Sequence, residues 1–144
     1  MELLKIWRNN FKGIHFVDSE SGTLLRGAVD DLLDVNSKLI VLDYKTRGFP
    51  LKDDSTSYYQ NQLNIYNFLL RKNGYDTEDY SYLLFFIPKG INDKGHFEFD
   101  TELTKMNIDV KFAQDVFHKA IMLLQNEVPE PVEKCDFCNW SRRS

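Results

Sequence analysis

Four consecutive apolar residues, Leu39 to Leu42, are followed at once by an acidic and a basic residue, Asp43 and Lys45. A segment that is apolar at every position is typical of a strand buried on both faces, in a sheet flanked by helices. Side chains alternate between faces along a strand, so Asp43 and Lys45 share a face. Burying a carboxylate and an ammonium where the strand emerges is tolerated when the groups are paired or bind a ligand. The pattern therefore indicates either a structural ion pair or a metal-binding site.

A second strand is predicted over residues 24–35, which are mostly apolar and include Gly27. Glycine has no side chain, so another backbone could approach the strand closely at this position. The polar residues 36–38 separate this strand from the one that contains Asp43. So short a polar connection predicts a hairpin of the two strands.

Two neighbouring acidic residues, Asp30 and Asp31, interrupt the first strand of this hairpin. Their side chains fall on opposite faces, so one of them would lie beside Asp43, and the pattern leaves open which one. Two carboxylates supply the hard oxygen ligands that suit Mg²⁺ or Mn²⁺ at about 2.0–2.1 Å. Lys45 beside such an ion could orient an attacking water or stabilise the charge that develops on a phosphate.

A helix is predicted over residues 57–73. Its apolar side chains recur at helical spacing, at Tyr59, Leu63, Tyr66 and Leu70. Ser57 and Gln60 predict a capping box at its start, and Gly74 predicts its end.

Two polar side chains of this helix, Gln62 and Tyr66, are four residues apart and lie on one face, where they could reach the same ligand or the same backbone. With the earlier residues they make an ordered series of motifs, Gly27-x-x-Asp30, Asp43-x-Lys45 and Gln62-x-x-x-Tyr66. The whole series is far more specific than any one motif. In this series the chain resembles the RecB-like branch of the PD-(D/E)XK nuclease superfamily, which includes CRISPR-associated and AddB-type nuclease domains.

The resemblance covers about residues 11–140 and implies both a fold and residue roles. The implied fold is α/β, a restriction-endonuclease-like mixed β-sheet of about four to five strands flanked by α-helices. The residues implied in catalysis are Asp30, Asp43, Lys45, Gln62 and Tyr66. Of these, Asp30 and Asp43 would be metal ligands with the carbonyl oxygen of Tyr44, Lys45 would be the catalytic lysine, and the last two would support the scissile phosphate.

The implied activity is Mg²⁺- or Mn²⁺-dependent hydrolysis of phosphodiester bonds in DNA, in repair, recombination or phage- or CRISPR-type DNA processing. By family analogy the DNA would be single-stranded or end-bearing. The alternative is a catalytically incomplete nuclease-fold module that binds DNA or a protein partner. Asp30, Asp43 and Lys45 together favour catalysis, because a degenerate site has no reason to keep costly charges at the end of a buried strand.

The two cysteines, Cys135 and Cys138, form a CxxC pair in a tail, residues 129–144, that follows a nuclease-like core over residues 1–128. Such a pair is half of a tetrahedral thiolate site, so an iron–sulfur cluster or Zn²⁺ would need additional cysteine ligands. These could come from a protein partner or from a missing N-terminal segment. The alternative is a pair of reduced, unused thiols.

The rest of the chain completes the predicted sheet and its cover. Residues 81–88 predict an apolar strand, and residues 96–100 predict an edge strand that forms a hairpin with it. A long amphipathic helix is predicted over residues 102–126, from a stripe at Leu103, Met106, Val110, Ala113, Phe117, Ala120 and Leu124.

Composition limits the partners. With 144 residues and 42% hydrophobic content, the chain can bury one core and is expected to form a single domain. It lacks both a membrane-spanning apolar run and the apolar core of a signal peptide, so we expect a cytoplasmic protein without membrane contact. A formal charge of −4 argues against strong independent binding of nucleic acid. Arg47 and Lys52, in the loop 46–57 beside the predicted site, could contact the phosphate backbone.

Overall fold

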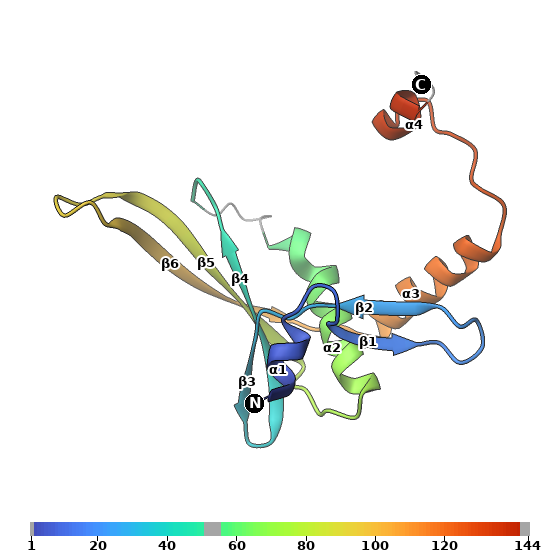
Figure 1. Ribbon diagram of the computed structural model, residues 1–144, viewed down its shortest axis with the longest axis horizontal. Helices are drawn as coiled ribbons and strands as arrows, with labels where there is room; N and C mark the ends of the chain where they lie inside the picture. Colours follow the sequence, from blue (N-terminus) through green and yellow to red (C-terminus); the bar gives the residue numbers. More distant parts are fainter. Residues whose placement is uncertain (1, 51–55, 142–144) are drawn as a thin grey trace.

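The computed structural model describes residues 2–50 and 56–141 and has a mixed α/β fold. A four-stranded sheet with the strand order β3-β4-β5-β6 forms its centre, and β1 and β2 form a separate two-stranded sheet (Figure 1). The elements are, in chain order, α1 (Glu2–Trp7), β1 (Ile14–Val17), β2 (Leu24–Gly27), β3 (Asp31–Val35), β4 (Lys38–Thr46), η1 (Ser57–Tyr59), α2 (Gln60–Lys72), β5 (Tyr80–Ile91), β6 (Phe97–Asn107), α3 (Val110–Gln125) and α4 (Asp136–Ser141).

The central sheet is mixed, as predicted. β4 and β5 are parallel, while the pairs β3–β4 and β5–β6 are antiparallel. A parallel pair needs a crossover connection, and α2 supplies it. The predicted fold class, a mixed sheet of about four to five strands with flanking helices, is therefore confirmed.

The predicted hairpin between the first two motif strands is also confirmed. β3 and β4 pair antiparallel from Asp31 opposite Leu42 to Val35 opposite Lys38. The two residues of the turn, at positions 36 and 37, have φ angles of 52° and 67°. Positive φ at both central residues matches the twist of a two-residue hairpin, which fixes the register of the site strands.

The prediction of one strand over residues 24–35 is wrong. β2 and β3 occupy this stretch, but they belong to different sheets and are separated by residues 28–30. Within this break, Val29 is only 1% exposed, and its backbone N–H donates to the carbonyl oxygen of Trp7 at 3.2 Å. A buried anchor thus turns the chain from one sheet to the other, immediately before β3.

α2 covers one face of the sheet through a shared core. The core residues of β4, β5 and α2 include Leu39, Val41, Leu63, Tyr66, Leu69, Leu70, Leu83 and Phe85. The opposite face of β4 is only partly covered, because Ile40 is buried but Tyr44 is 39% exposed. The prediction that both faces of this strand are covered therefore holds for its first half only.

The predicted capping box at the start of this helix is wrong. Ser57 lies in a 3₁₀ turn, and α2 starts at Gln60 after Tyr59, whose side chain makes no capping hydrogen bond. The predicted end is confirmed, since α2 ends at Lys72 and Gly74 takes a φ of +82°.

The predicted helix over residues 102–126 begins too early. β6 continues to Asn107, and α3 starts at Val110 after Asp109, whose carboxylate accepts the N–H of Phe112 at 2.8 Å. Leu103 and Met106 fit the helical spacing of the stripe, but both are strand residues. The predicted hairpin of the preceding two strands is confirmed as β5–β6, which runs well beyond residues 81–88 and 96–100.

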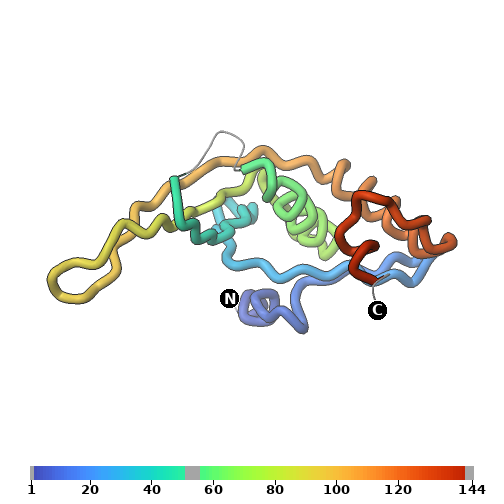
Figure 2. The backbone as a smooth tube through the Cα atoms, turned by 90° about the horizontal axis from the view of Figure 1, so that it is seen from above, coloured from blue at the N-terminus to red at the C-terminus, as the bar shows by residue number. Residues whose placement is uncertain are grey.

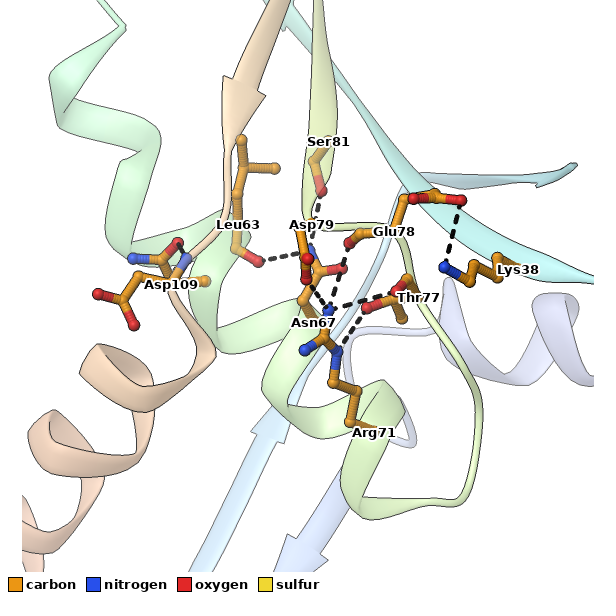
Figure 3. A network of polar contacts seen from close by, with 10 residues as sticks. Lys38, Leu63, Asn67, Arg71, Thr77, Glu78, Asp79, Ser81 and Asp109 are labelled. Carbon is orange, nitrogen blue, oxygen red and sulfur yellow. Dashed lines mark hydrogen bonds and ion pairs between the residues drawn. The ribbon is translucent and has the colours of Figure 1, made fainter.

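Polar side chains fix the end of α2 to the start of β5 (Figure 3). The amide of Asn67 donates to the carbonyl oxygen of Leu63 at 2.9 Å and to Oγ of Ser81 at 2.8 Å. Nε of Arg71 donates to Oγ1 of Thr77 at 2.8 Å. We call this set, with Asp79 as the ion-pair partner of Arg71, the α2–β5 network; it holds β5 in place beside β4.

The β5–β6 hairpin and the C-terminal tail lie at opposite ends of the molecule in both views (Figures 1 and 2). In the tail, α4 stands apart from the central sheet, with Phe137 84% and Trp140 74% exposed. Among the described helices, none has the length and hydropathy of a membrane span.

Candidate active site

Asp43 lies towards the C-terminal end of β4, on the face that α2 covers. Its side chain is buried, with 1% of its surface exposed. Nζ of Lys45, on the same face of β4, forms an ion pair with Oδ2 of Asp43. Apart from this ammonium, no group among the described residues donates to that oxygen. Among the described residues, the only positively charged partner of this buried carboxylate oxygen is therefore Lys45, whose side chain is 18% exposed.

Asp30 lies beside Asp43, just before β3. Its Oδ2 accepts the backbone N–H of Tyr44 at 2.9 Å. This bond lies just beyond the last residue pair of β3 and β4, which is Asp31 with Leu42. This bond aims the Asp30 carboxylate at the site end of β4. The pKa of Asp43 is raised, chiefly by burial and further by the Asp30 carboxylate, although Lys45 lowers it.

Asp31 faces away from this pair of carboxylates. Its Oδ2 accepts the phenol of Tyr44 at 2.9 Å and forms an ion pair with Arg8 at 2.8 Å. The strand pattern left open whether Asp30 or Asp31 meets Asp43, and the family resemblance implied Asp30. The structure brings Asp30 there.

Lys45, Gln62 and Tyr66 form a chain of hydrogen bonds. Nζ of Lys45 donates to Oε1 of Gln62 at 3.0 Å, and Nε2 of Gln62 donates to the phenolic oxygen of Tyr66 at 2.7 Å. The pKa of Tyr66 is raised by burial, which the bond from Gln62 opposes and the charge of Asp43 reinforces. We call Asp30, Asp43, Lys45, Gln62 and Tyr66 together the carboxylate cluster; the structure brings all five predicted catalytic residues to one place.

Gly27 belongs to the same construction. A Cβ atom at this position would lie 2.9 Å from Cε1 of Tyr66 and 3.2 Å from Cδ1 of Leu69. The predicted reason for the glycine was the approach of a backbone, but its close neighbours are these two side chains. The glycine therefore leaves the room in which the ring of Tyr66 reaches Gln62.

The sequence analysis missed Tyr59 as a neighbour of the site. The ammonium of Lys45 lies 4.8 Å from the centre of its ring, and the ring packs against Phe85 at 6.0 Å. A cation over an aromatic face is attracted by the ring quadrupole. In the sequence, Tyr59 is predicted only as an apolar position of the helix. The signal that could have found it is its place three residues before Gln62, near the same end of the predicted helix.

A further positive charge, that of Arg47, lies directly after the end of β4. Arg47 follows in the alternation and stacks on Phe49, with its guanidinium carbon 5.0 Å from the ring centre. Its contact with phosphate stays a prediction. Lys52, predicted in the same role, lies outside the described residues.

The donor set fits a hard divalent cation. The described residues contain no group of three His, Cys, Asp or Glu side chains arranged to hold a metal. Mg²⁺, however, is usually bound through one or two carboxylates, with waters filling the other positions. The buried Oδ2 of Asp43, which has no partner besides Lys45 among the described residues, and the neighbouring carboxylate of Asp30 match this requirement. The carbonyl oxygen of Tyr44 stays a prediction as a further ligand.

The two cysteines lie in the tail. Cys135 and Cys138 are free, half-buried thiols at α4. The pKa of Cys135 is lowered, first by a hydrogen bond from the backbone of Cys138 and then by its thiol. Their predicted metal or cluster binding stays a prediction.

A mixed sheet whose parallel strand pair is bridged by a helix, with two aspartates and a lysine gathered at one strand end, defines a nuclease-like α/β protein. The chain belongs to the PD-(D/E)XK nuclease superfamily, whose family model matches residues 2–143. Comparison with curated proteins and with solved structures gave no match. Membership indicates nuclease activity on nucleic acid with a divalent metal.

Proposed function

We propose that the protein is a Mg²⁺- or Mn²⁺-dependent nuclease that hydrolyses phosphodiester bonds in DNA. The observation that carries this proposal is the buried Oδ2 of Asp43, which lies beside Asp30 and has Lys45 as its only partner in the part of the chain that the structure describes. A carboxylate so placed costs desolvation energy that a bound cation would offset. Superfamily membership supports the same reaction class.

Asp30 and Asp43 would hold the ion. When bound there, a divalent ion neutralises phosphate charge and lowers the pKa of a bound water. The ammonium of Lys45 lies beside the carboxylate of Asp43. With a divalent ion held by the two carboxylates, the positive charge of Lys45 would be available to a phosphate or to an attacking water.

Gln62 and Tyr66 would set the direction of that ammonium. Because Nε2 of Gln62 donates to the phenolic oxygen of Tyr66, the other end of its amide, Oε1, faces Lys45. The Lys45 ammonium is thereby held next to Gln62, and the ring of Tyr59 limits its movement in another direction. A positioned charge is worth more to a transition state than a mobile one.

The finer assignments are part of the proposal. They are the RecB-like branch, a single-stranded or end-bearing DNA substrate, a cytoplasmic role in repair, recombination or phage- or CRISPR-type DNA processing, and an iron–sulfur cluster or Zn²⁺ on Cys135 and Cys138. The motif order and the CxxC pair support them. A cluster or zinc site would require further cysteine ligands from a partner or from an additional N-terminal segment.

The test of activity is cleavage of end-labelled single- and double-stranded DNA in the presence of Mn²⁺. The wild type and Lys119→Ala, whose lysine is exposed on α3, should cut, and Lys45→Ala should not. A wild type that binds Mn²⁺ and DNA without cutting would favour the alternative, an incomplete nuclease-fold module.

The metal ligands are tested separately by calorimetric titration with Mn²⁺. Asp30→Asn should abolish binding, whereas Asp31→Asn should retain it, because the second carboxylate points to Arg8 and Tyr44. Equal loss in both variants would refute the assignment of Asp30. The two variants differ by one position and remove the same charge, so general electrostatic effects cancel.

A further inference from the structure

The outer edge of β6 is a long strand edge of the same sheet that carries the carboxylate cluster. It is the last strand in the order β3-β4-β5-β6, so among the described residues only β5 pairs with it. The pairing runs along the whole strand, from Phe97 to Asn107. The backbone groups of the other edge therefore form a row that is open to another strand.

The two faces of β6 differ sharply in character. Glu98, Asp100 and Glu102 alternate along one face. The other face carries apolar side chains with large exposed fractions, Phe97 (68%), Phe99 (45%) and Leu103 (58%). Over residues 97–103, β6 is thus acidic on one side and apolar on the other, and the side chains of both sides are exposed, whereas Met106 further along the acidic side is buried in the core.

The acidic side is only partly neutralised. Asp100 forms an ion pair with Lys89 at 2.9 Å, and Glu98 accepts a hydrogen bond from the amide of Asn92 at 3.3 Å. Lys105 does not help, because it lies on the other face over the ring of Tyr80, 3.6 Å from its centre. Three carboxylates therefore face one lysine along this edge.

Charged side chains also protect edge strands from aggregation, and here the sign of the charge matters. Two copies of β6 paired edge to edge would bring carboxylates against carboxylates, which is destabilising. β6 contains neither proline nor glycine, and the irregularity of the hairpin lies in β5, between Pro88 and Gly90. The edge is thus closed to its own copies but open to a strand of opposite charge.

We propose that the outer edge of β6 binds an extended segment of a partner protein in which basic and apolar residues alternate. Backbone hydrogen bonds to the edge would hold the segment as a fifth strand of the sheet. Its lysines or arginines would pair with Glu98, Asp100 and Glu102, and its apolar residues would extend the surface of Phe99 and Leu103.

The position of this edge connects it with the carboxylate cluster. Glu102 lies opposite Phe85 in β5, and Phe85 lies opposite Lys45 in β4, so all three side chains point to the same face of the sheet. A basic strand on β6 would therefore add positive charge to the face that carries the site. This would offset the acidic character of a chain with a formal charge of −4.

The test uses a fluorescent peptide in which lysine and valine alternate, titrated with the whole chain and followed by anisotropy. The charge-reversed variant E98K/D100K/E102K should bind about tenfold or more weakly, since three exposed ion pairs are lost. The matched control is E127K/E130K/E133K, which makes the same change of charge in the tail and should bind as the wild type does.

Two further measurements separate strand addition from simple charge attraction. The same peptide with every second amide N-methylated keeps its charge but loses one row of donors, and it should not bind. Hydrogen exchange in residues 97–107 should slow when the unmodified peptide is present. Equal binding of the methylated peptide, equal loss in the tail variant, or protection elsewhere would overturn the proposal. Self-association of the wild type through β6 would also overturn the proposal, and its loss in E98K/D100K/E102K would locate that association at β6. None of these readouts depends on nuclease activity.

Discussion

α2 contacts two polar clusters whose chemistry differs. Towards its end, the α2–β5 network contains a buried amide, Asn67, whose two donors are both used, and a guanidinium, Arg71, bound to a hydroxyl and a carboxylate. Towards its beginning, the carboxylate cluster contains a buried charge, Asp43, next to a second carboxylate. Among the described residues, the amide oxygen of Asn67 has no hydrogen-bond donor, and Oδ2 of Asp43 has the Lys45 ammonium as its ion-pair partner and no other donor.

The two clusters differ in the free energy that burial of this oxygen costs the folded chain. A neutral amide oxygen without a partner costs on the order of 1–3 kcal/mol, and a buried charge costs more. In the first cluster the surrounding bonds serve the fold alone, since they attach β5 to the helix. In the second cluster the cost of the charge is retained at a place where a cation can bind. Substitutions in the two clusters should therefore separate activity from stability.

The largest expected effect is that of Asp43→Asn on cleavage. Asparagine keeps the shape of the side chain but loses the charge that would hold the metal, so the cleavage rate should fall about 10³-fold. The free energy of unfolding at neutral pH should stay the same or rise, because burial disfavours the charged carboxylate. Cleavage assays and urea denaturation measure the two quantities. A large loss of stability would place Asp43 with the structural cluster and undo the comparison.

The opposite result is expected for Asn67→Ala. Two hydrogen bonds to Leu63 and Ser81 are lost in a fully buried place, so unfolding should become easier by about 2–3 kcal/mol. Activity per folded molecule should not change. The matched control is Asn61→Ala, an exposed position of the same helix, which should shift the urea midpoint very little.

A smaller effect is expected for Tyr66→Phe, which removes the acceptor of the Gln62 amide. The amide can then turn, and Lys45 loses its fixed partner, so kcat should fall about tenfold, equal to about 1.4 kcal/mol. Tyr75→Phe, in the core beside Trp7, should leave kcat unchanged. If Tyr66→Phe lowers stability but not kcat, the hydrogen-bond chain is structural.

The smallest effect concerns pH. The pKa of Asp43 is raised in the folded chain by burial, so the folded chain takes up this proton more readily than the unfolded chain does. Stability is therefore greatest below the ordinary carboxyl pKa, falls as pH rises towards the raised pKa, and stays lower above it. Urea denaturation across this interval should show a decline for the wild type that Asp43→Asn lacks. Parallel curves for the two proteins would contradict the assigned cause.

Sequence reasoning located the carboxylate cluster well because its members are tied to strong local patterns. The apolar run before Asp43 favoured a buried strand, and the short polar turn that precedes it indicated its hairpin partner. The family resemblance named Asp30. Strand alternation alone could not choose between Asp30 and Asp31, because the alternation rule fails where β2 ends and the chain changes sheets. That change depends on the packing of Val29, which is a tertiary contact.

The error in the last helix has a similar cause. Leu103 and Met106 are three residues apart, so they suit a helix, yet residues 97–103 also alternate as a strand does. Pairing with β5 decides in favour of the strand, and the Asp109 cap then sets where α3 begins. Neither the partner strand nor Tyr59 beneath Lys45 is visible in local periodicity.

The contact between Gly27 and Tyr66 has a consequence for how such a chain can change over generations. Any larger residue at 27 would push on the ring of Tyr66, and through it on the amide of Gln62. A single substitution at 27 therefore acts at a distance on Lys45, and a smaller residue at 66 is needed to accommodate it. The first and third motifs are thus coupled through a direct contact, and a change in either one alters the space that the other occupies.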